Sequence, residues 1–273
     1  MTGRVDAQRV PSAVPALVSA AHIGPALAVT LLAGLLATAQ GLDARTSALV
    51  VSAVLAGQLS IGWSNDLIDL GRDRRTGRAD KPLVAGAVSV DVVRAACGIA
   101  VVTCVLLSLA TGLLPGLVHL ICVGAGWAYN LGLKKTVWSW LPYAVAFGGL
   151  TAFVALAGDV PPPWWWPVGG ALLGVGAHLL NVLPDLADDA TTGVQGLPHR
   201  LGERWIAPAA TVVLVAASAV VLLGGAPTLV VALPAALVVT VLAAVVLTAT
   251  GHGPFLAAIG IALVDAAMLV SAR

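Results

Sequence analysis

Charged residues are scarce in this sequence. Lys, Arg, Asp and Glu together make up 10% of the 273 residues, whereas hydrophobic residues make up 59% and the mean hydropathy is +0.98. A soluble globule of this length would need more polar surface than that composition supplies. The net charge of +1 also gives no reason to expect a nucleic-acid partner. The composition therefore predicts an integral protein of the lipid bilayer.

Cysteine is also rare. Cys97, Cys104 and Cys122 all fall in apolar runs, and the sequence has no Cys-x-x-Cys motif and no His at ligand spacing from them. This pattern is typical of small packing residues and does not support a metal site or a disulfide framework.

Long apolar runs, in contrast, fill most of the chain. A bilayer span needs about 20 residues, and by that measure the sequence contains nine candidate spans, at about 17–40, 47–65, 92–113, 115–133, 138–158, 164–184, 205–224, 227–249 and 254–271. We therefore expect one all-α domain over residues 1–273. It should be a polytopic membrane helix bundle of about nine transmembrane helices, preceded by a short cytoplasmic segment at 1–15.

The basic residues predict the orientation of these spans, because Lys and Arg near span ends favour the cytoplasmic side. With the N-terminus inside, only Arg45 and Arg273 of the 14 basic residues fall outside. This placement puts the C-terminus outside the cell membrane. Asp265 lies towards the outer end of the last span, where we expect it to snorkel or to pair with Arg273.

An acidic motif ends the second apolar run. It reads Asn65-Asp66-Leu-Ile-Asp69-Leu-Gly-Arg-Asp73 and is expected in the loop after that span. If these residues are helical, the three Asp residues at i, i+3 and i+7 project from one face. Three carboxylates on one stripe repel each other unless a cation lies among them, and magnesium prefers oxygen ligands. The motif therefore indicates a magnesium site.

A second acidic cluster follows the sixth span. Asp185, Asp188 and Asp189 lie there, and Asn181 and His178 precede Asp185 by one and two helical turns. Polar groups at that membrane depth face a cavity or a partner. We expect Asn181 in a pocket, while for His178 a pocket role and a packing role both remain open.

The predicted topology places both acidic clusters on the cytoplasmic face. Lys134 and Lys135, after the fourth span, lie on the same face and offer positive charge to an anionic ligand. Basic residues on that face are also explained as a topology signal. Carboxylates contribute little to topology, so the presence of the acidic clusters needs another explanation.

Taken together, these motifs resemble the UbiA superfamily of intramembrane prenyltransferases. Asn65 to Asp73 resembles its first aspartate-rich motif, and Asp185-x-x-x-Asp189 resembles its second. Tyr129-Asn130 with Lys134 and Lys135, and the loop Asp80-Lys81-Pro82 to Gly86, are similar to two further family segments. Gly196 departs from the pattern, since a Thr is common there, and Asp188 leaves open which of Asp188 and Asp189 binds metal.

The resemblance implies a magnesium-dependent transfer of a prenyl group from a prenyl diphosphate to a hydrophobic acceptor, with an aromatic one favoured. It assigns Asp66, Asp69, Asp185 and Asp189 to catalysis. The implied metal ligands are Asn65, Asp66, Asp69, Asp73, Asp185, Asp188 and Asp189. The implied diphosphate contacts are Arg72, Lys81, Lys134 and Arg200. The implied pocket residues are Tyr129, Asn130, His178 and Asn181. No oligomeric state follows.

Other classes of membrane protein remain as alternatives. A terpene cyclase of the same superfamily would use both acidic clusters to ionise a diphosphate without an acceptor. A cation transporter is disfavoured because its polar residues should recur through the membrane, and here they gather at one face. A CDP-alcohol phosphotransferase needs an Asp-Gly-x-x-Ala-Arg opening to its motif, which this sequence lacks.

Overall fold

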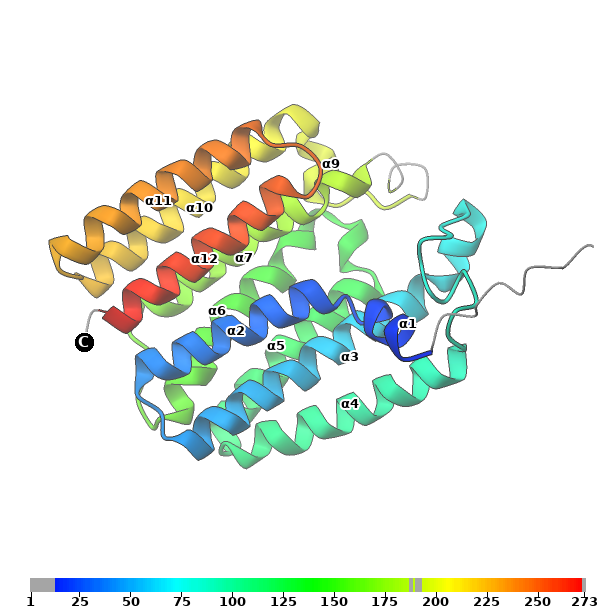
Figure 1. Ribbon diagram of the computed structural model, residues 1–273, viewed down its shortest axis with the longest axis horizontal. Helices are drawn as coiled ribbons and strands as arrows, with labels where there is room; N and C mark the ends of the chain where they lie inside the picture. Colours follow the sequence, from blue (N-terminus) through cyan, green and yellow to red (C-terminus); the bar gives the residue numbers. More distant parts are fainter. Residues whose placement is uncertain (1–12, 187–188, 190–192, 272–273) are drawn as a thin grey trace, which may run out of the picture.

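The computed structural model describes residues 13–186, 189 and 193–271 (Figure 1). Every element in this part of the chain is helical. The α-helices are α1 (Ala13–Ala20), α2 (Ile23–Gln40), α3 (Ala44–Thr76), α4 (Val90–Ala110), α5 (Leu113–Leu131), α6 (Leu141–Ala157), α7 (Trp165–Asn181), α9 (Leu197–Leu201), α10 (Glu203–Gly225), α11 (Leu229–Thr248) and α12 (Gly253–Ser271). Short 3₁₀ helices are η1 (Leu133–Lys135), η2 (Val137–Trp140) and η3 (Leu183–Asp185).

The number of spans agrees with the sequence. Eight helices in the described part of the chain are long and apolar enough to cross a membrane, and a shorter apolar helix, Gly253–Met268, lies within α12. The all-α membrane bundle of about nine spans is therefore confirmed. This is a multi-pass membrane protein.

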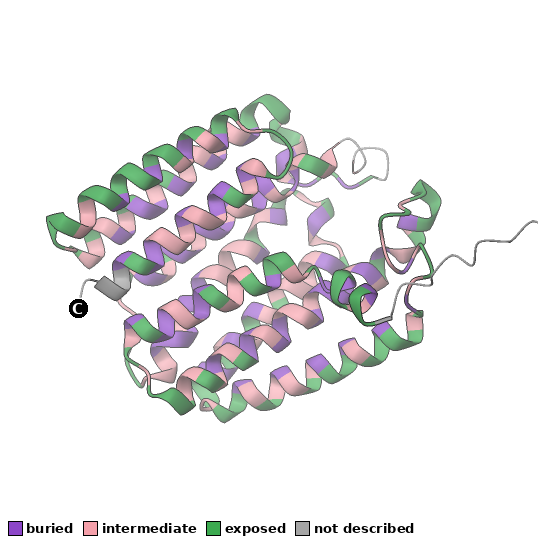
Figure 2. Cartoon of the chain, viewed as in Figure 1, coloured by how far each residue is buried: buried purple, intermediate pink, exposed green. Residues whose placement is uncertain are grey.

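The long helices form a closed ring. Each helix from α2 to α6 packs against the next one, as far as α7. Helix α7 then packs against α10, α10 against α11, and α11 against α12. The ring closes where α12 packs against α2, and the two helices run side by side in Figure 1. The outward faces are largely exposed and apolar, as on α11 with Val230 at 84% exposure (Figure 2). Apolar side chains on that surface suit contact with lipid.

The first predicted span is not one helix. Residues 17–40 are divided into the end of α1 and all of α2 by a turn at Ala21 and His22. His22 caps α2 in the left-handed region, with φ 52. Residues other than glycine rarely adopt that conformation. The break between the two helices therefore sets the direction in which the His22 side chain points.

Helix α3 is longer than a membrane span. Asp43 begins it by accepting hydrogen bonds from the backbone N–H groups of Arg45 and Thr46, at 2.8 and 3.1 Å. Gly77 ends it in the left-handed region, with φ 71. The prediction that residues 66–73 form a loop is wrong, because this capped helix continues through them to Thr76.

Small residues allow α6 and α7 to approach closely. A Cβ atom at Gly170 would lie 2.7 Å from the carbonyl oxygen of Phe147, and one at Gly148 would lie 2.8 Å from that of Pro167. Such contacts are typical of helix packing within membranes. This close approach fixes the position of α6 relative to α7, and with it the positions of the α6 side chains beyond the acidic residues.

Two predictions about isolated residues have different outcomes. The three cysteines are free and buried, in agreement with a packing role. Asp265 does not snorkel, since it is 2% exposed and accepts a hydrogen bond from Ser218 at 3.0 Å. Its other predicted partner, Arg273, lies outside the described residues.

Candidate active site

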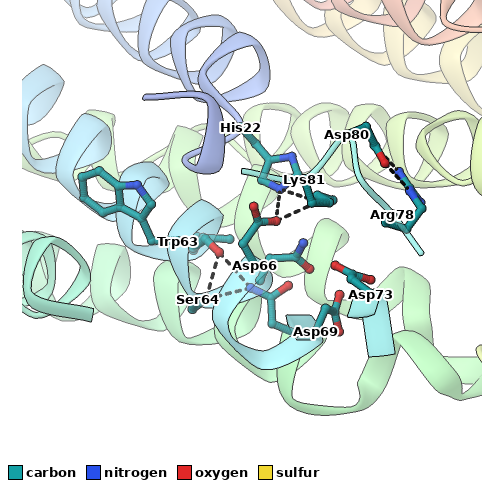
Figure 3. A network of polar contacts seen from close by, with 12 residues as sticks. His22, Trp63, Ser64, Asp66, Asp69, Asp73, Arg78, Asp80 and Lys81 are labelled. Carbon is teal, nitrogen blue, oxygen red and sulfur yellow. Dashed lines mark hydrogen bonds and ion pairs between the residues drawn. The ribbon is translucent and has the colours of Figure 1, made fainter. Parts of the chain in front are cut away.

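The first acidic motif occupies one buried stripe near the C-terminal end of α3. Asp66, Asp69 and Asp73 are 2%, 6% and 2% exposed, respectively. The carboxylate of Asp66 points towards Lys81, in the loop that follows α3 (Figure 3). The expected common helix face is therefore observed, although the residues lie within a helix and not in a loop.

Asp66 lies between two side chains from other segments. Lys81 Nζ donates to its Oδ1 at 2.7 Å, and His22 Nε2 lies 2.9 Å from the same oxygen (Figure 3). The other oxygen, Oδ2, is buried and has no hydrogen-bond partner among the described residues. An unpaired buried carboxylate oxygen is costly, so this atom is available to a ligand.

Asp69 is paired with Lys134 of η1. Lys134 Nζ lies 2.8 and 2.6 Å from the two carboxylate oxygens, and it also reaches Asn65 Oδ1 at 3.4 Å. Arg72 Nη2 donates to Asp69 at 3.0 Å. Burial lowers the pKa of Lys134, and the adjoining Asp69 carboxylate opposes that shift.

The second acidic cluster lies within reach of the arginines that follow the first. Arg72 Nη1 lies 3.8 Å from Asp189 Oδ1, and Arg78 Nη1 lies 3.5 Å from Asp185 Oδ1. The two motifs, more than a hundred residues apart in the sequence, therefore converge at one end of the bundle. Asp188, a predicted metal ligand, lies outside the described residues.

The two described carboxylates of this cluster, Asp185 and Asp189, lie in different environments. Burial raises the pKa of Asp189 to about 6, while Arg72 partly offsets the effect. His199 Nε2 lies 3.6 Å from Asp189 Oδ2. The side chain of Asp185 is 50% exposed, so it is the more hydrated of the pair. Among the described residues, no three His, Cys, Asp or Glu side chains form a cluster that could hold a metal ion.

Comparison with known proteins identifies the family. The sequence pattern of the UbiA prenyltransferase family matches residues 26–253. The chain belongs to this family. It is therefore an enzyme of the UbiA prenyltransferase family, and the resemblance to that family predicted from the sequence is confirmed. No curated protein matches it.

Solved UbiA structures share the fold. A UbiA homolog from Aeropyrum pernix K1, in its apo form, is 19% identical, with a TM-score of 0.75 over 88% of this chain and 96% of that one. A UbiA homolog from Archaeoglobus fulgidus, bound to GPP and Mg²⁺, is 12% identical, with a TM-score of 0.69 over 94% and 98%. A digeranylgeranylglyceryl phosphate synthase is 16% identical, with a TM-score of 0.65 over 95% and 96%.

Two predicted pocket residues of this UbiA chain hold helices together. Asn130 Nδ2 donates to the Ile61 carbonyl at 2.9 Å and to Ser64 at 2.8 Å, which fastens α5 to α3. His178 is 0% exposed, and its Nε2 lies 2.9 Å from Ser139 Oγ. The ring of His178 also lies 4.8 Å from that of Tyr143, so its predicted pocket role stays a prediction beside this packing contact.

The other two predicted pocket residues meet around Tyr143. Asn181 Nδ2 donates to the Tyr143 hydroxyl at 3.2 Å. The ring of Tyr129 lies edge-on to that of Tyr143, with centroids 5.3 Å apart. Tyr143 is thus an aromatic link that the sequence analysis did not select. Its spacing four residues before Phe147 on an apolar helix was the available signal.

The predicted diphosphate contacts do not all reach the acidic residues. Arg72, Lys81 and Lys134 do, as described above. Arg200 is exposed on α9 and forms no ion pair with a carboxylate in the described part of the chain. Arg78, which the sequence analysis did not select, contacts Asp185 and forms a two-point pair with Asp80 at 3.0 and 2.9 Å.

His22 is the other site residue that sequence reasoning missed. It reaches Asp66 across 44 positions of sequence. The available signal was a titratable residue within a long apolar run, just before Gly24 and Pro25. A Gly-Pro pair often marks a turn, and here it marks a break between helices.

Proposed function

We propose that this UbiA enzyme transfers a prenyl group from a prenyl diphosphate to a hydrophobic acceptor, with Mg²⁺ at the two acidic motifs. The observation that carries the proposal is the convergence of both motifs, linked through Arg72 and Arg78. The relative from Archaeoglobus fulgidus was solved with GPP and Mg²⁺, which supports the same ligands here.

The residues at the site fit magnesium chemically. They offer carboxylate oxygens, including the unpaired buried Oδ2 of Asp66. Because magnesium usually takes only one or two protein carboxylates and completes its shell with water and phosphate, a preformed three-ligand cluster is not required. One ion would be bound at Asn65, Asp66, Asp69 and Asp73, directly through one or two of these carboxylates and through water to the others. A second would be held by Asp185 and Asp189, with Asp188 beside them.

Bound Mg²⁺ would supply the positive charge that stabilises diphosphate as a leaving group. The protein adds cations of its own. Lys134, Lys81 and Arg72 already lie at the carboxylates, and we expect them to turn to the diphosphate oxygens when ligand binds. The apolar walls behind Tyr143 would keep water from the allylic cation until the acceptor attacks it.

We infer the acceptor class and the orientation from weaker observations. An aromatic acceptor is favoured by family prevalence, and the rings of Tyr129 and Tyr143 would suit stacking with it. The basic residues that follow α3 lie at the same end as the acidic motifs, which supports a cytoplasmic opening.

The test is diphosphate release from geranyl or farnesyl diphosphate by the purified enzyme, with and without an aromatic acceptor. Asp69→Ala and Asp185→Ala should each abolish turnover, and the control Asp91→Ala, an exposed carboxylate on α4 paired with Arg94 at 2.8 Å, should retain it. EDTA should stop the reaction and added Mg²⁺ should restore it. Wild-type activity in either site variant would overturn the metal assignment, and release without an acceptor would indicate a cyclase.

A further inference from the structure

The turn between α1 and α2 is held against α3, next to the first acidic motif. A Cβ atom at Gly62 would overlap the carbonyl oxygen of Ala21, so this glycine lets the turn lie directly on α3. One residue further along α3, Trp63 Nε1 donates to the Leu17 carbonyl of α1 at 2.9 Å. These two contacts fix the backbone from which the His22 side chain projects.

His22 reaches the acidic motif from this turn. Asp66 follows Gly62 by four residues on α3, so its carboxylate lies one helical turn beyond the point of contact. His22 Nε2 is 2.9 Å from Asp66 Oδ1 (Figure 3). A carboxylate oxygen only accepts hydrogen bonds, so this ring nitrogen carries the hydrogen and donates it. Lys81 Nζ lies 3.3 Å from the same ring nitrogen, and the two are therefore donors that share one acceptor.

Both donors use the same oxygen of Asp66. Lys81 Nζ lies 2.7 Å from Oδ1, and the contacts of Lys81 and His22 converge on that atom in Figure 3. The second oxygen, Oδ2, is buried and has no hydrogen-bond partner among the described residues. A buried oxygen without a partner is costly. The arrangement therefore gives Oδ1 to the protein and leaves Oδ2 for a ligand.

The two donors differ in how freely they can leave Asp66. Lys81 has a flexible four-carbon stem and belongs to the loop after α3, and the proposed function moves it to the diphosphate. The imidazole of His22 is short and rigid, and it starts from a left-handed residue, with φ 52, in the turn that α3 holds. His22 is therefore the donor that stays at Asp66 when ligand binds.

We infer that His22 is a positioning residue for the metal: by holding Oδ1 of Asp66, it presents Oδ2 to the Mg²⁺ of the first motif. The inference rests on the proposed function, because it concerns the metal proposed there. Hydrogen bonds to a metal-binding group fix its orientation, and their loss typically lowers metal affinity about 10- to 100-fold. His22 itself would contact neither the metal nor the prenyl diphosphate.

The test measures Mg²⁺ binding by calorimetry in the presence of geranyl S-thiolodiphosphate, an analogue that does not react. His22→Gly removes the imidazole and keeps the left-handed backbone. His22→Gln replaces the ring Nε2–H by an amide N–H at a similar distance from the backbone. We expect the dissociation constant for Mg²⁺ to rise about tenfold in His22→Gly and to stay near wild type in His22→Gln. The control is Ala226→Gly, at another left-handed residue (φ 42) beyond α10, and it should bind Mg²⁺ as wild type does.

A kinetic readout separates positioning from a direct part in the chemistry. Diphosphate release is measured in the assay of the proposed function while Mg²⁺ is raised at saturating prenyl diphosphate. For His22→Gly we expect half-saturation at a higher Mg²⁺ concentration and a kcat close to wild type once the metal saturates, since the same complex then forms. A kcat that stays about tenfold below wild type at saturating Mg²⁺ would overturn the positioning role.

The binding outcomes each have a distinct meaning. Unchanged Mg²⁺ affinity in His22→Gly, or an equal loss in His22→Gln, overturns the role of His22 and leaves the proposed function intact. If wild type binds no Mg²⁺ with the analogue, the proposed function fails and this inference fails with it. If His22→Gly does not fold, His22→Asn decides, because Asn accepts the left-handed conformation but is too short to place a donor at the position of ring Nε2. Wild-type Mg²⁺ affinity in that variant overturns the inference, and a loss of about tenfold supports it.

Discussion

Lys134 Nζ lies 2.6 Å from Asp69 Oδ2, although 65 positions of sequence separate the two residues. Both side chains are nearly buried, at 6% and 7% exposure. Asp66 is paired in the same manner with Lys81, and Asp189 lies near Arg72. Each carboxylate of the proposed magnesium ligands that the structure describes thus has a cation of the protein beside it. We expect the carboxylates to exchange these protein cations for the metal when the metal and the diphosphate bind. The ligands would therefore enter a pocket that is already charged, and not a neutral one.

The Lys134–Asp69 pair predicts a separation of stability from activity. Lys134→Met should destabilise the protein by about 2 kcal/mol, because it leaves the buried Asp69 carboxylate with Arg72 as its one remaining partner among the described residues. It should also raise the KM for the prenyl diphosphate. Thermal unfolding in detergent and steady-state kinetics measure the two effects.

A double variant provides the control for this pair. Lys134→Met with Asp69→Asn removes both charges, so thermal stability should largely return, while turnover should be abolished by the loss of the Asp69 carboxylate. Recovery of turnover in the double variant would contradict the assignment of Asp69 to the metal.

The burial of Asp189 predicts a pH dependence of Mg²⁺ binding. Its pKa is raised to about 6, so the carboxyl is increasingly protonated as the pH falls through 6. Only the deprotonated form ligates a cation, and Mg²⁺ affinity should therefore decline below that pH. Calorimetric titration from pH 5 to 8 measures it, with Asp189→Asn as the control that should lose most of this dependence. An affinity that is flat across the range would remove Asp189 from the ligand set.

Gly196 predicts a steric requirement in the loop before α9. A Cβ atom there would lie 2.7 Å from both the Lys134 carbonyl oxygen and Ser139 Oγ. Ser139 also accepts a hydrogen bond from the backbone N–H of Leu197 at 2.9 Å. Gly196→Ala should therefore move the loop away from η1 and lower stability by about 1–3 kcal/mol.

Gly71→Ala is the matched control for that substitution. A Cβ atom at Gly71 meets nothing within 4 Å, although the residue lies on α3 directly before Arg72. Its stability should be equal to wild type or slightly higher, since Ala favours a helix. Equal stability of both variants, by thermal unfolding, would show that the loop tolerates a side chain.

The sequence predicted the spans and the convergence of the acidic residues for physical reasons. Hydrocarbon demands about 20 apolar residues per helix, so composition alone locates helices such as α4 and α11. The number of spans between two segments then determines whether they lie on the same side of the membrane. That count placed Asp69 and Asp185 at the same end of the helix bundle. The i, i+3, i+7 spacing placed the Asp residues of α3 on one face without any knowledge of their neighbours.

The unpredicted features depend on contacts between distant segments. Periodicity does not show that His22 breaks a helix to reach Asp66, or that Asp265 meets Ser218. The close approach that excludes a side chain at Gly196 depends on the position of η1 relative to α9. In each case the decisive neighbour lies at least 44 positions away, beyond the range of helical patterns.

The contact between α12 and α2 has a consequence for biosynthesis. These helices are the first and last members of the ring, so the ring stays open to lipid until the final span has inserted. Insertion of α12 is therefore the step that closes the ring. A nascent chain halted before that point would already carry both acidic motifs but would lack the closed ring of helices that the proposed carbocation would need around it.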